Sequence, residues 1–589
     1  MKRLLSLTVL VLLVGCQPKQ TNSHTALNEL FTRYWQQQMK FFPLEATMQG
    51  DSTYNNVLVN DQTRAYRDSL ATLYQQFLTR LEQFDRNVLD ENDKTSYDIF
   101  QYEMQQRLAG LRQPAWMMPF NQFYGVPLTL GQYGAGQGIQ PFRTVRDYDD
   151  WLARARGFPA WADSAIANFR VGMRYGVVLP KALVVKMVPQ MRSPEIDVTD
   201  PTKSLYWGPI TRLPAGFSAA DKQRLTEAYK KLILTDLVPA YRRLGNFLAG
   251  DYQQSARSTS GLESIPGGPG LYSYDVAYWT TTNQTPQEIY ETGLREVARI
   301  RGEMEKVKTQ LGFQGDLKAF FYYLRTNPKF KPYRTPAEVL AAFLKIQQTI
   351  EPNLPKLFGR KPKTPFKIQE TEKFREASSY FEYNPGSPDG KRPGIFYVPI
   401  PNARQFNTTE GMDAVFLHEA IPGHHYQFSL QQENQDLPKF RQFGLYGAML
   451  EGWGLYAESL GRQLGAYTDP YQYIGALGKE MHRAVRLVVD TGLHSRGLTR
   501  EAAIAYMLDN EPVEAPSAIA EIERYMALPG QALSYKVGEL KIKQLRDKYQ
   551  KELGSKFDLR AFHDELLKDG AMPLTVLERK MDAWAKTIK

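Results

Sequence analysis

The sequence predicts a mainly α-helical protein with one small β element. Apolar residues recur at three- and four-residue spacing in long segments of the 589-residue chain, as the buried face of a helix requires. Strand signals are few, and only 366–369 and 394–398 have the length and composition of short strands. A hydrophobic fraction of 42% and a charged fraction of 23% are typical of a folded globular protein.

The N-terminus has the pattern of a bacterial lipoprotein signal. A basic start precedes an apolar run over residues 4–14, which is too short to span a bilayer. The four residues ending in Cys16 (Leu-Val-Gly-Cys) resemble a lipobox, and Cys16 is the only cysteine of the chain. We therefore expect a signal peptide over 1–15 and a lipidated tether over 16–25. Gln17 after the cysteine predicts sorting to the outer membrane, and the alternative is an ordinary secretory signal.

The first half of the body is expected to combine helices with two long loops. Residues 26–50, 61–85 and 220–249 have helical periodicity. The stretches 114–142 and 260–274 are rich in Pro and Gly, which favours loops.

Two helices in the middle of the chain have clear start signals. Thr285 and Thr335 are each followed by Pro and, three residues on, by Glu. This is the pattern of an N-cap threonine, a proline at the first helical position and a capping box. The two helices should end near Leu311 and Ile350, and the last 60 residues are also expected to be helical.

Composition excludes several kinds of site. The net charge of +10 is mild for this length and no block of Lys and Arg is present, so a nucleic-acid partner is not expected. A single cysteine excludes a disulfide framework and a Cys-ligated metal. The chain has no Walker A motif and no Gly-x-Ser-x-Gly elbow. Beyond the signal peptide, no run of 18 apolar residues occurs, so only the lipid is expected to reach the membrane.

Histidine is scarce but clustered, with five of the seven between positions 418 and 494. His418-Glu419 opens a motif like His-Glu-x-x-His, in which two histidines bind zinc and the glutamate activates a water. Pro422 stands where the second histidine would be, and the next ones are His424 and His425. On a straight helix these would rise about 9 and 10.5 Å from His418. Pro and Gly interrupt helices, so a local bulge could bring His424 back.

Together with a second motif, these residues resemble a known family. Residues 418–425 and the Glu-Gly-Trp-Gly-Leu-Tyr-Ala-Glu segment at 451–458 are similar to the bacterial family catalogued as domain of unknown function 885, often lipoproteins. The resemblance implies kinship with helical zinc peptidases of the angiotensin-converting-enzyme, oligopeptidase and carboxypeptidase type. It implies an elongated zincin-like body over 26–589 with a deep cleft, and an active-site half at about 365–545.

The resemblance implies a ligand set for Zn²⁺. His418 and His424 would bind the ion and Glu419 would activate the water, although the choice between His424 and His425 stays open. A catalytic zinc also needs a third protein ligand, and Glu451 is predicted to supply it. Seven residues further, on the same helical face, Glu458 would either bind the ion or hold a ligand imidazole.

Four further residues are candidates for contacts with a substrate. On the resemblance, Tyr535 donates a hydrogen bond to the oxyanion, and His494 is a second candidate for this role. Arg524 is predicted to receive a substrate carboxylate in a bidentate contact. Tyr383 lies in a segment that could line the cleft and pair with an extended peptide.

These features predict a lipid-anchored zinc peptidase that acts on peptides by a metal-activated water. One alternative is a non-catalytic surface lipoprotein that binds peptide or glycan. A second is a metallohydrolase of a non-peptide amide, which would share the site. The identity of the substrate, exo- or endopeptidase action, the oligomeric state and the side of the membrane stay open at this stage.

Overall fold

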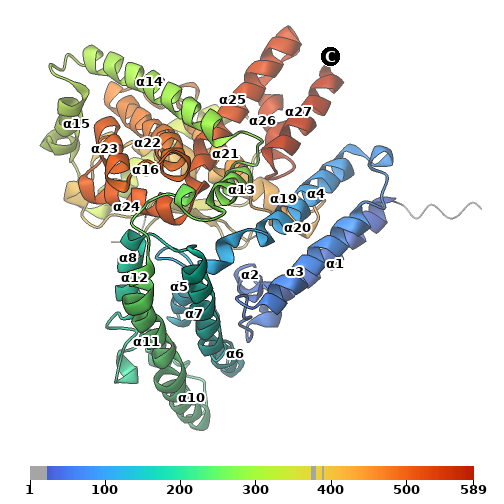
Figure 1. Cartoon of the computed structure of the whole chain (residues 1–589). Helices are drawn as coiled ribbons and strands as arrows, with labels where there is room; N and C mark the ends of the chain where they lie inside the picture. Colours follow the sequence, from blue (N-terminus) through green and yellow to red (C-terminus); the bar gives the residue numbers. More distant parts are fainter. Residues whose placement is uncertain (1–22, 373–379, 388–389) are drawn as a thin grey trace, which may run out of the picture.

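The computed structural model describes residues 23–372, 380–387 and 390–589 (Figure 1). The predicted signal peptide, Cys16 and residues 16–22 of the predicted tether lie outside this part of the chain. The tether was expected to extend to residue 25, but helix α1 already begins at Ser23. Within α1, His24 contacts the Asp93 carboxylate at 2.9 Å.

The protein is mainly α-helical, as the sequence predicts, and it contains one three-stranded sheet in the described residues. The chain begins with α1 (Ser23–Phe41), α2 (Pro43–Met48), α3 (Arg64–Leu81) and α4 (Glu91–Leu111). A second group follows, made of α5 (Val126–Gly134), α6 (Val145–Ala155), α7 (Phe158–Tyr175), α8 (Lys181–Met191), α9 (Gly208–Thr211), α10 (Ala219–Lys231), α11 (Val238–Phe247) and α12 (Gln253–Ser255).

The remaining helices and the strands build the larger C-terminal part. Before the sheet come α13 (Gly268–Thr280), α14 (Pro286–Gln310), α15 (Leu317–Thr326) and α16 (Pro336–Ile350). The strands are β1 (Phe366–Glu370), β2 (Glu382–Asn384) and β3 (Gly394–Val398). After the sheet come α18 (Met412–Glu419), α19 (His424–Glu433), α20 (Lys439–Gln442), α21 (Gly447–Ser459), α22 (Pro470–Ser495), α23 (Arg500–Asn510), α24 (Ala515–Ala527), α25 (Ser534–Leu553), α26 (Leu559–Leu567) and α27 (Leu574–Ile588).

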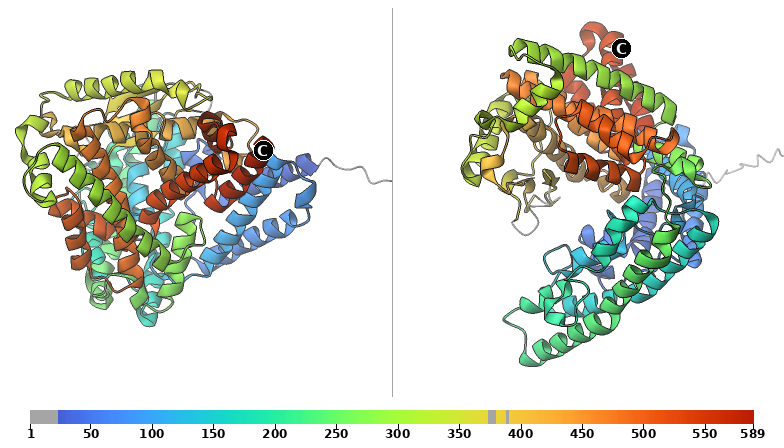
Figure 2. Two further views of the ribbon diagram at one scale, coloured as in Figure 1. Left: turned by 90° about the horizontal axis from the view of Figure 1, so that it is seen from above. Right: turned by 60° about the vertical axis from the view of Figure 1, so that its left-hand side comes forward.

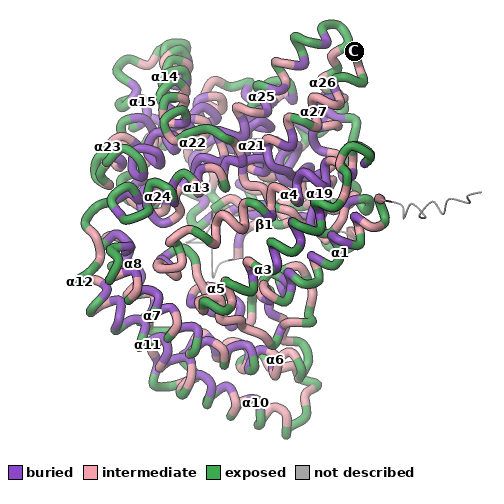
Figure 3. Tube along the Cα trace, turned by 45° about the vertical axis from the view of Figure 1, so that its right-hand side comes forward, coloured by how far each residue is buried: buried purple, intermediate pink, exposed green. Residues whose placement is uncertain are grey.

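Three hydrophobic clusters hold these helices together. The first joins α1, α3 and α4 to the sheet, α18, α21 and the C-terminal helices. The second is confined to α5–α11 and the segments between them, and Figure 2 shows these helices as a separate limb. The third fills the space between α14, α15 and α22–α24. Buried residues follow α21 and α22 for most of their length, which places these two helices in the middle of the larger part (Figure 3).

The predicted helix starts are confirmed. The Thr285 side chain accepts a hydrogen bond from the Glu288 amide, and Glu288 returns one to Thr285 in a complete capping box. Thr335 also caps α16 by accepting from the Glu338 amide, but Glu338 accepts from the Arg334 amide instead, so the capping box predicted there is not complete. The helical run predicted at 220–249 is continuous but contains a π-helical segment, Leu232–Leu237. The segment ends two residues before Pro239, which has no amide hydrogen to donate and therefore interrupts the regular ladder of helical hydrogen bonds.

Two predicted loops contain helices, so the loop assignment was wrong there. Helix α5 lies within 114–142, and α13 begins at Gly268 inside 260–274. Each helix has a proline in its first turn, Pro127 and Pro269. A first-turn amide has no helical acceptor in any case, so proline costs little there.

The sheet has the order β1-β3-β2, with β3 parallel to β1 and antiparallel to β2. Strands β1 and β3 match the two predicted strands, whereas β2 was not predicted. The buried Phe396 of β3 packs edge-on against Phe343 of α16 and Phe416 of α18, with ring centroids 5.4 and 6.2 Å away. The sheet therefore supports the helix that carries His418 and Glu419.

Candidate metal centre

The two candidate histidine ligands lie on either side of a helix break. Helix α18 ends at Glu419, the Ile421–Pro422 peptide bond is cis, and α19 begins at His424. The sequence suggested a bulge within one helix, but the structure has two helices joined by a short turn. A Cβ atom on Gly423 would lie 1.8 Å from the carbonyl oxygen of His418, so only glycine allows the turn to pass this closely.

The break brings His418 and His424 together. Their ring centroids are 4.7 Å apart and their planes are nearly perpendicular, at 84°. From α21, Glu451 Oε2 lies 3.4 Å from Nε2 of His418 and 3.7 Å from Nε2 of His424. Ligands at about 2.0–2.1 Å around a tetrahedral zinc are about 3.3 Å from one another. The two distances to Glu451 are close to this value, and one ligand atom from each residue lies within 4.8 Å of the other two, so the three side chains can share one ion.

Glu458, two helical turns after Glu451 on α21, orients the imidazole of His418. Its Oε1 lies 2.8 Å from Nδ1 of His418, which leaves Nε2 directed at Glu451. Burial alone would lower the pKa of His418, but the Glu451 and Glu458 carboxylates outweigh it and raise this pKa to about 10. By contrast, Nδ1 of His424 is buried and has no hydrogen-bond partner within the described residues.

The predicted catalytic carboxylate, Glu419, follows His418 directly. Burial raises its pKa, and the imidazoles of His418 and His424 offset part of this effect. No hydrogen bond to Glu419 is found in the described part of the chain. Its carboxylate is therefore free to take part in proton transfer beside the three ligands.

Residues next to Glu451 explain the Glu-Gly-Trp-Gly motif. A Cβ atom on Gly454 would lie 2.5 Å from Cε1 of His418, so glycine makes room for the ligand ring. The Trp453 indole Nε1 donates to the carbonyl oxygens of Pro422 at 2.9 Å and Gly423 at 3.3 Å. Trp453 thus holds the turn between the two histidine helices.

A third position of this motif fixes the distance between α21 and α25. A Cβ atom on Gly452 would lie 2.4 Å from the backbone carbon of Gly538. A Cβ atom on Gly538 would in turn lie 1.9 Å from the carbonyl oxygen of Ala448. The two helix backbones are therefore in direct contact, one residue after Glu451 and three residues after Tyr535.

The neighbouring His425 points elsewhere. Its Nδ1 lies 2.8 Å from the Tyr383 hydroxyl and 3.3 Å from Ser429 Oγ. Burial lowers the pKa of His425 to about 4, so the ring is neutral. Of the two alternatives for the second ligand, the structure brings His424 to Glu451. Tyr383 is 8% exposed, and its hydroxyl is engaged by His425 rather than directed to a substrate.

His494 does not meet the expectation of an oxyanion contact. The side chain is fully buried, and Nδ1 accepts a hydrogen bond from the Leu262 amide at 3.2 Å. Nε2 lies 3.0 Å from the carbonyl oxygen of Tyr525, and the ring packs on Tyr272. Burial lowers the pKa of His494 to about 3, so both ring nitrogens are occupied in a neutral ring. His494 connects α22 to the backbone around it and has no donor left for a substrate.

Tyr535, at the start of α25, fits its expected place better. The negative charge of Glu451 is close enough to contribute, after burial, to a raised pKa of the Tyr535 hydroxyl. No hydrogen bond of this hydroxyl is found among the described residues. Three arginines surround Tyr535, the predicted Arg524 and two from α22 that the sequence did not single out, Arg483 and Arg486.

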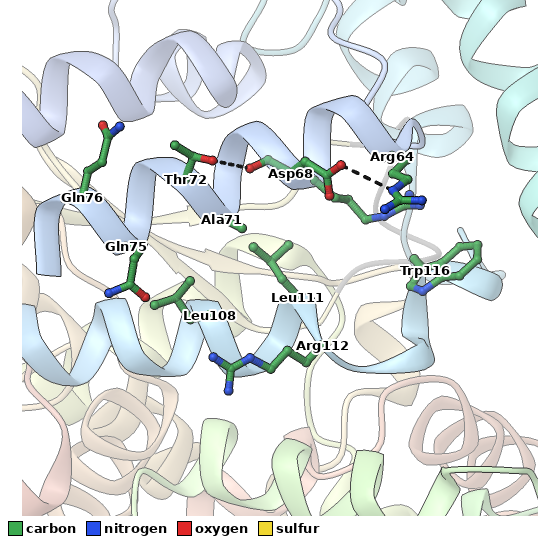
Figure 4. A pocket seen from close by; sticks show the side chains of 11 residues that line it. Arg64, Asp68, Ala71, Thr72, Gln75, Gln76, Leu108, Leu111, Arg112 and Trp116 are labelled. Carbon is green, nitrogen blue, oxygen red and sulfur yellow. Dashed lines mark hydrogen bonds and ion pairs between the residues drawn. The ribbon is translucent and has the colours of Figure 1, made fainter. Parts of the chain in front are cut away.

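Two other features could suggest a site but have ordinary roles. His24, Asp90 and Asp93 are close enough to share an ion, yet Asp90 is exposed and caps α4 while Asp93 accepts from His24. A groove of about 760 Å³ lies between α3 and α4 (Figure 4). Two of its cations are already engaged, because Arg64 faces the Asp68 carboxylate and the Arg67 guanidinium lies over Trp116.

Comparison with known proteins gives a family without an assigned activity. The model of the family described as "Bacterial protein of unknown function (DUF885)" matches residues 43–581. No curated protein matches the chain significantly. In the described part of the chain, no helix is both long and apolar enough to cross a membrane.

Two solved structures are similar over almost the whole chain. One is a provisionally assigned lipoprotein from Colwellia psychrerythraea, with 26% identity, a TM-score of 0.85, and coverage of 96% of this chain and 99% of the other. The second is a lipoprotein of unknown function from Shewanella oneidensis, also provisionally assigned. It has 21% identity, a TM-score of 0.75, and coverage of 94% and 99%, and at this identity it supports the fold alone.

Proposed function

The chain belongs to the DUF885 family of bacterial proteins, and from this premise we propose that it is a zinc-dependent peptidase. The observation that carries the proposal is the meeting of three ligand atoms from His418, His424 and Glu451 beside the carboxylate of Glu419. Two imidazoles and one carboxylate leave a fourth position of a tetrahedral zinc open for water, as in other catalytic zinc sites.

The division of roles follows from the positions of the side chains. When bound, zinc would lower the pKa of a water and polarise the carbonyl of the scissile amide. Glu419 accepts the proton of the water and passes it to the leaving amine. The Tyr535 hydroxyl, which has no hydrogen-bond partner among the described residues, donates to the oxygen that gains negative charge. Glu458 keeps Nε2 of His418 directed at the ion through its hydrogen bond to Nδ1.

The proposed location is a bacterial membrane, reached through a lipid on Cys16. The lipobox-like sequence and the similarity to provisionally assigned lipoproteins support this attachment. The proposal includes the outer membrane as the destination, because Gln rather than Asp follows Cys16.

The deciding experiment measures metal content and hydrolysis together. We expect about one zinc per chain after purification without chelators, and cleavage of a mixed peptide library. Glu419→Gln should retain the metal and lose hydrolysis, because Glu419 is placed to move a proton and not to bind the ion. A protein without stoichiometric metal would contradict the proposal. Metal without peptide cleavage would instead favour a metallohydrolase of a non-peptide amide.

A further inference from the structure

Three arginines, Arg483, Arg486 and Arg524, form a cluster around the start of α25. The Arg486 guanidinium lies 4.6 Å from the centroid of the Tyr535 ring, and that of Arg483 lies 5.8 Å from it. Arg524 is close enough for its charge to act on the Tyr535 hydroxyl. We call this group the arginine cluster.

Arg486 is the anchored member of the arginine cluster. It is 6% exposed, its Nε donates to the Tyr525 hydroxyl at 2.9 Å, and its Nη2 donates to Glu521 at 3.0 Å. Its Nη1 is buried and has no hydrogen-bond partner within the described residues. The guanidinium is therefore held in place by two of its nitrogens, and the third can donate to an additional acceptor.

Arg483 and Arg524, the two other members, have fewer and longer hydrogen bonds than Arg486. Arg483 donates from Nη1 to the Lys479 carbonyl oxygen at 3.2 Å, and no ion pair of its guanidinium is found in the described ranges. Arg524 has only long contacts, 3.5 Å to Gln531 Oε1 and 3.6 Å to Glu521. The Nε atoms of both arginines are buried without a hydrogen-bond partner among the described residues.

The carboxylate that pairs with the arginine cluster, Glu521, also contacts a histidine. Glu521 faces Arg486, but it also lies 3.4 Å from Nε2 of His482. Glu511, the next carboxylate, lies 2.6 Å from Nδ1 of the same histidine. Within the described ranges, Glu521 is the one carboxylate that forms ion pairs with the arginine cluster. Buried guanidinium donors are costly when unmet, so the cluster favours an additional acceptor.

The arginine cluster adjoins the candidate metal centre. Tyr535, whose ring centroid lies 4.6 Å from the Arg486 guanidinium, is three residues before Gly538, and the Gly538 backbone contacts Gly452, the residue after Glu451. Tyr535 thus lies between the arginines and the ligand Glu451. An anionic group held by the cluster would lie beside Tyr535, the residue proposed to contact the oxygen of the scissile carbonyl.

We infer that the arginine cluster binds a carboxylate of the substrate, so that the enzyme selects peptides with an anionic group close to the scissile bond. This inference rests on the proposed peptidase function. The planar fork of a guanidinium matches a carboxylate with two parallel hydrogen bonds. In a peptide, that carboxylate comes from the C-terminus or from an Asp or Glu side chain.

The test compares three forms of one peptide on the zinc-loaded full chain. The forms carry a free C-terminal acid, a C-terminal amide, or a C-terminal amide with Glu as the last residue. We expect kcat/KM about 10- to 100-fold higher for a form with a correctly placed carboxylate than for the plain amide, as for a hydrogen-bonded charge pair. The form that shows the gain identifies the source of the carboxylate.

Variants of the arginine cluster assign the effect to its residues. Arg483→Gln and Arg524→Gln should reduce the ratio of kcat/KM between the acid form and the amide form towards one, mainly because KM for the acid form rises. Arg483→Lys should keep part of the preference, because the charge remains and the fork is lost. The matched control is Arg295→Gln on the exposed side of α14, which should keep the full preference. Thermal unfolding of each variant identifies proteins that fail to fold.

A binding measurement separates this inference from the proposed function. Zinc-loaded Glu419→Gln should bind the acid form about 10- to 100-fold more tightly than the amide in calorimetry, without turnover. Cleavage of peptides with equal kcat/KM for all three forms would overturn the inference and leave the peptidase function intact. If Arg483→Gln lowered kcat equally for all three forms, the inference would also be overturned. That result would show that Arg483 stabilises the transition state and does not select a carboxylate. Absence of any cleavage contradicts the proposed function, whereas the binding comparison still tests the arginine cluster.

Discussion

Nδ1 of His418 and Oε1 of Glu458 lie 2.8 Å apart in a buried pair, so this hydrogen bond fixes which ring nitrogen of His418 faces Glu451. The two carboxylates come from one helix, α21, two turns apart. A single helix therefore carries both a metal ligand and the group that orients another ligand.

Glu458→Gln should weaken zinc binding by about 10- to 100-fold. The amide keeps the volume but loses the charge that stabilises the Nδ1–H of His418, and this is the usual effect of such a change next to a ligand histidine. Competition with a chromophoric chelator measures the affinity. Glu501→Gln, at a carboxylate that is 75% exposed, is the control and should bind zinc as the parent does. Equal affinities of the Glu458 variant and the parent would contradict the orienting role.

Gly454→Ala should reduce zinc affinity and lower the free energy of unfolding by about 1–3 kcal/mol, as overpacking does. The new methyl group would lie 2.5 Å from Cε1 of His418 and would push the ring from its place. Gly302→Ala is the control, because its Cβ meets nothing within 4 Å on the exposed part of α14. It should stabilise the protein by about 0.5–1 kcal/mol and leave zinc binding unchanged. Urea unfolding and chelator competition on both variants provide the comparison.

Asp490→Asn should reduce the pH dependence of stability. Burial raises the pKa of Asp490 to about 7, and hydrogen bonds from the Tyr272 hydroxyl and the Gly530 amide offset part of this effect. The unfolded chain releases this proton near pH 3.9, so the folded state holds a proton that the unfolded state has lost. The free energy of unfolding therefore falls as pH rises from about 4 to about 7, by an amount on the order of 2–4 kcal/mol.

Urea unfolding at pH 5 and pH 8 measures this contribution. Asparagine can still accept the two hydrogen bonds, so the variant should lose less stability between the two pH values than the parent. The nearby Asp275, whose pKa is also raised by burial and by Asp490, should contribute to the slope that remains. Identical slopes in the two proteins would show that Asp490 is ionised in the folded state at both pH values.

Cys16→Ser should move the protein from the membrane fraction to the soluble fraction and abolish labelling with a fatty acid. The proposed attachment is the lipid on Cys16, and serine lacks the sulfur that would carry it. A parent protein that is soluble and unlabelled would favour an ordinary secretory signal.

Local signals in the sequence were sufficient for much of the fold. The Thr285 and Thr335 caps depend on residues three positions apart, and both formed as predicted. The proline-rich stretches were misassigned because proline breaks a helix interior but suits a first turn, and composition alone does not separate the two positions. Strand β2 is only three residues long and is specified by its pairing with β3, which no local pattern reveals.

The candidate site was predictable where its spacing is encoded on one helix. Glu451 and Glu458 were placed by their seven-residue spacing, and Glu458 does contact His418. The position of His424 depends on the turn at Pro422 and Gly423, so periodicity could not place it. His494 was misjudged because the partners that occupy its ring, Leu262 and Tyr525, are distant in sequence. Arg483 was missed because the sequence does not show which arginines find a carboxylate partner. Its lack of an ion pair among the described residues is seen only in the folded structure.

The contact between Gly452 and Gly538 has a consequence for motion. It joins the segment that carries Glu451 to the segment that carries Tyr535, so these two groups should move as one rigid body. The helices α5–α11 have their own hydrophobic cluster and do not take part in that contact. A rotation of these helices relative to the larger part would therefore leave the distance between Glu451 and Tyr535 unchanged.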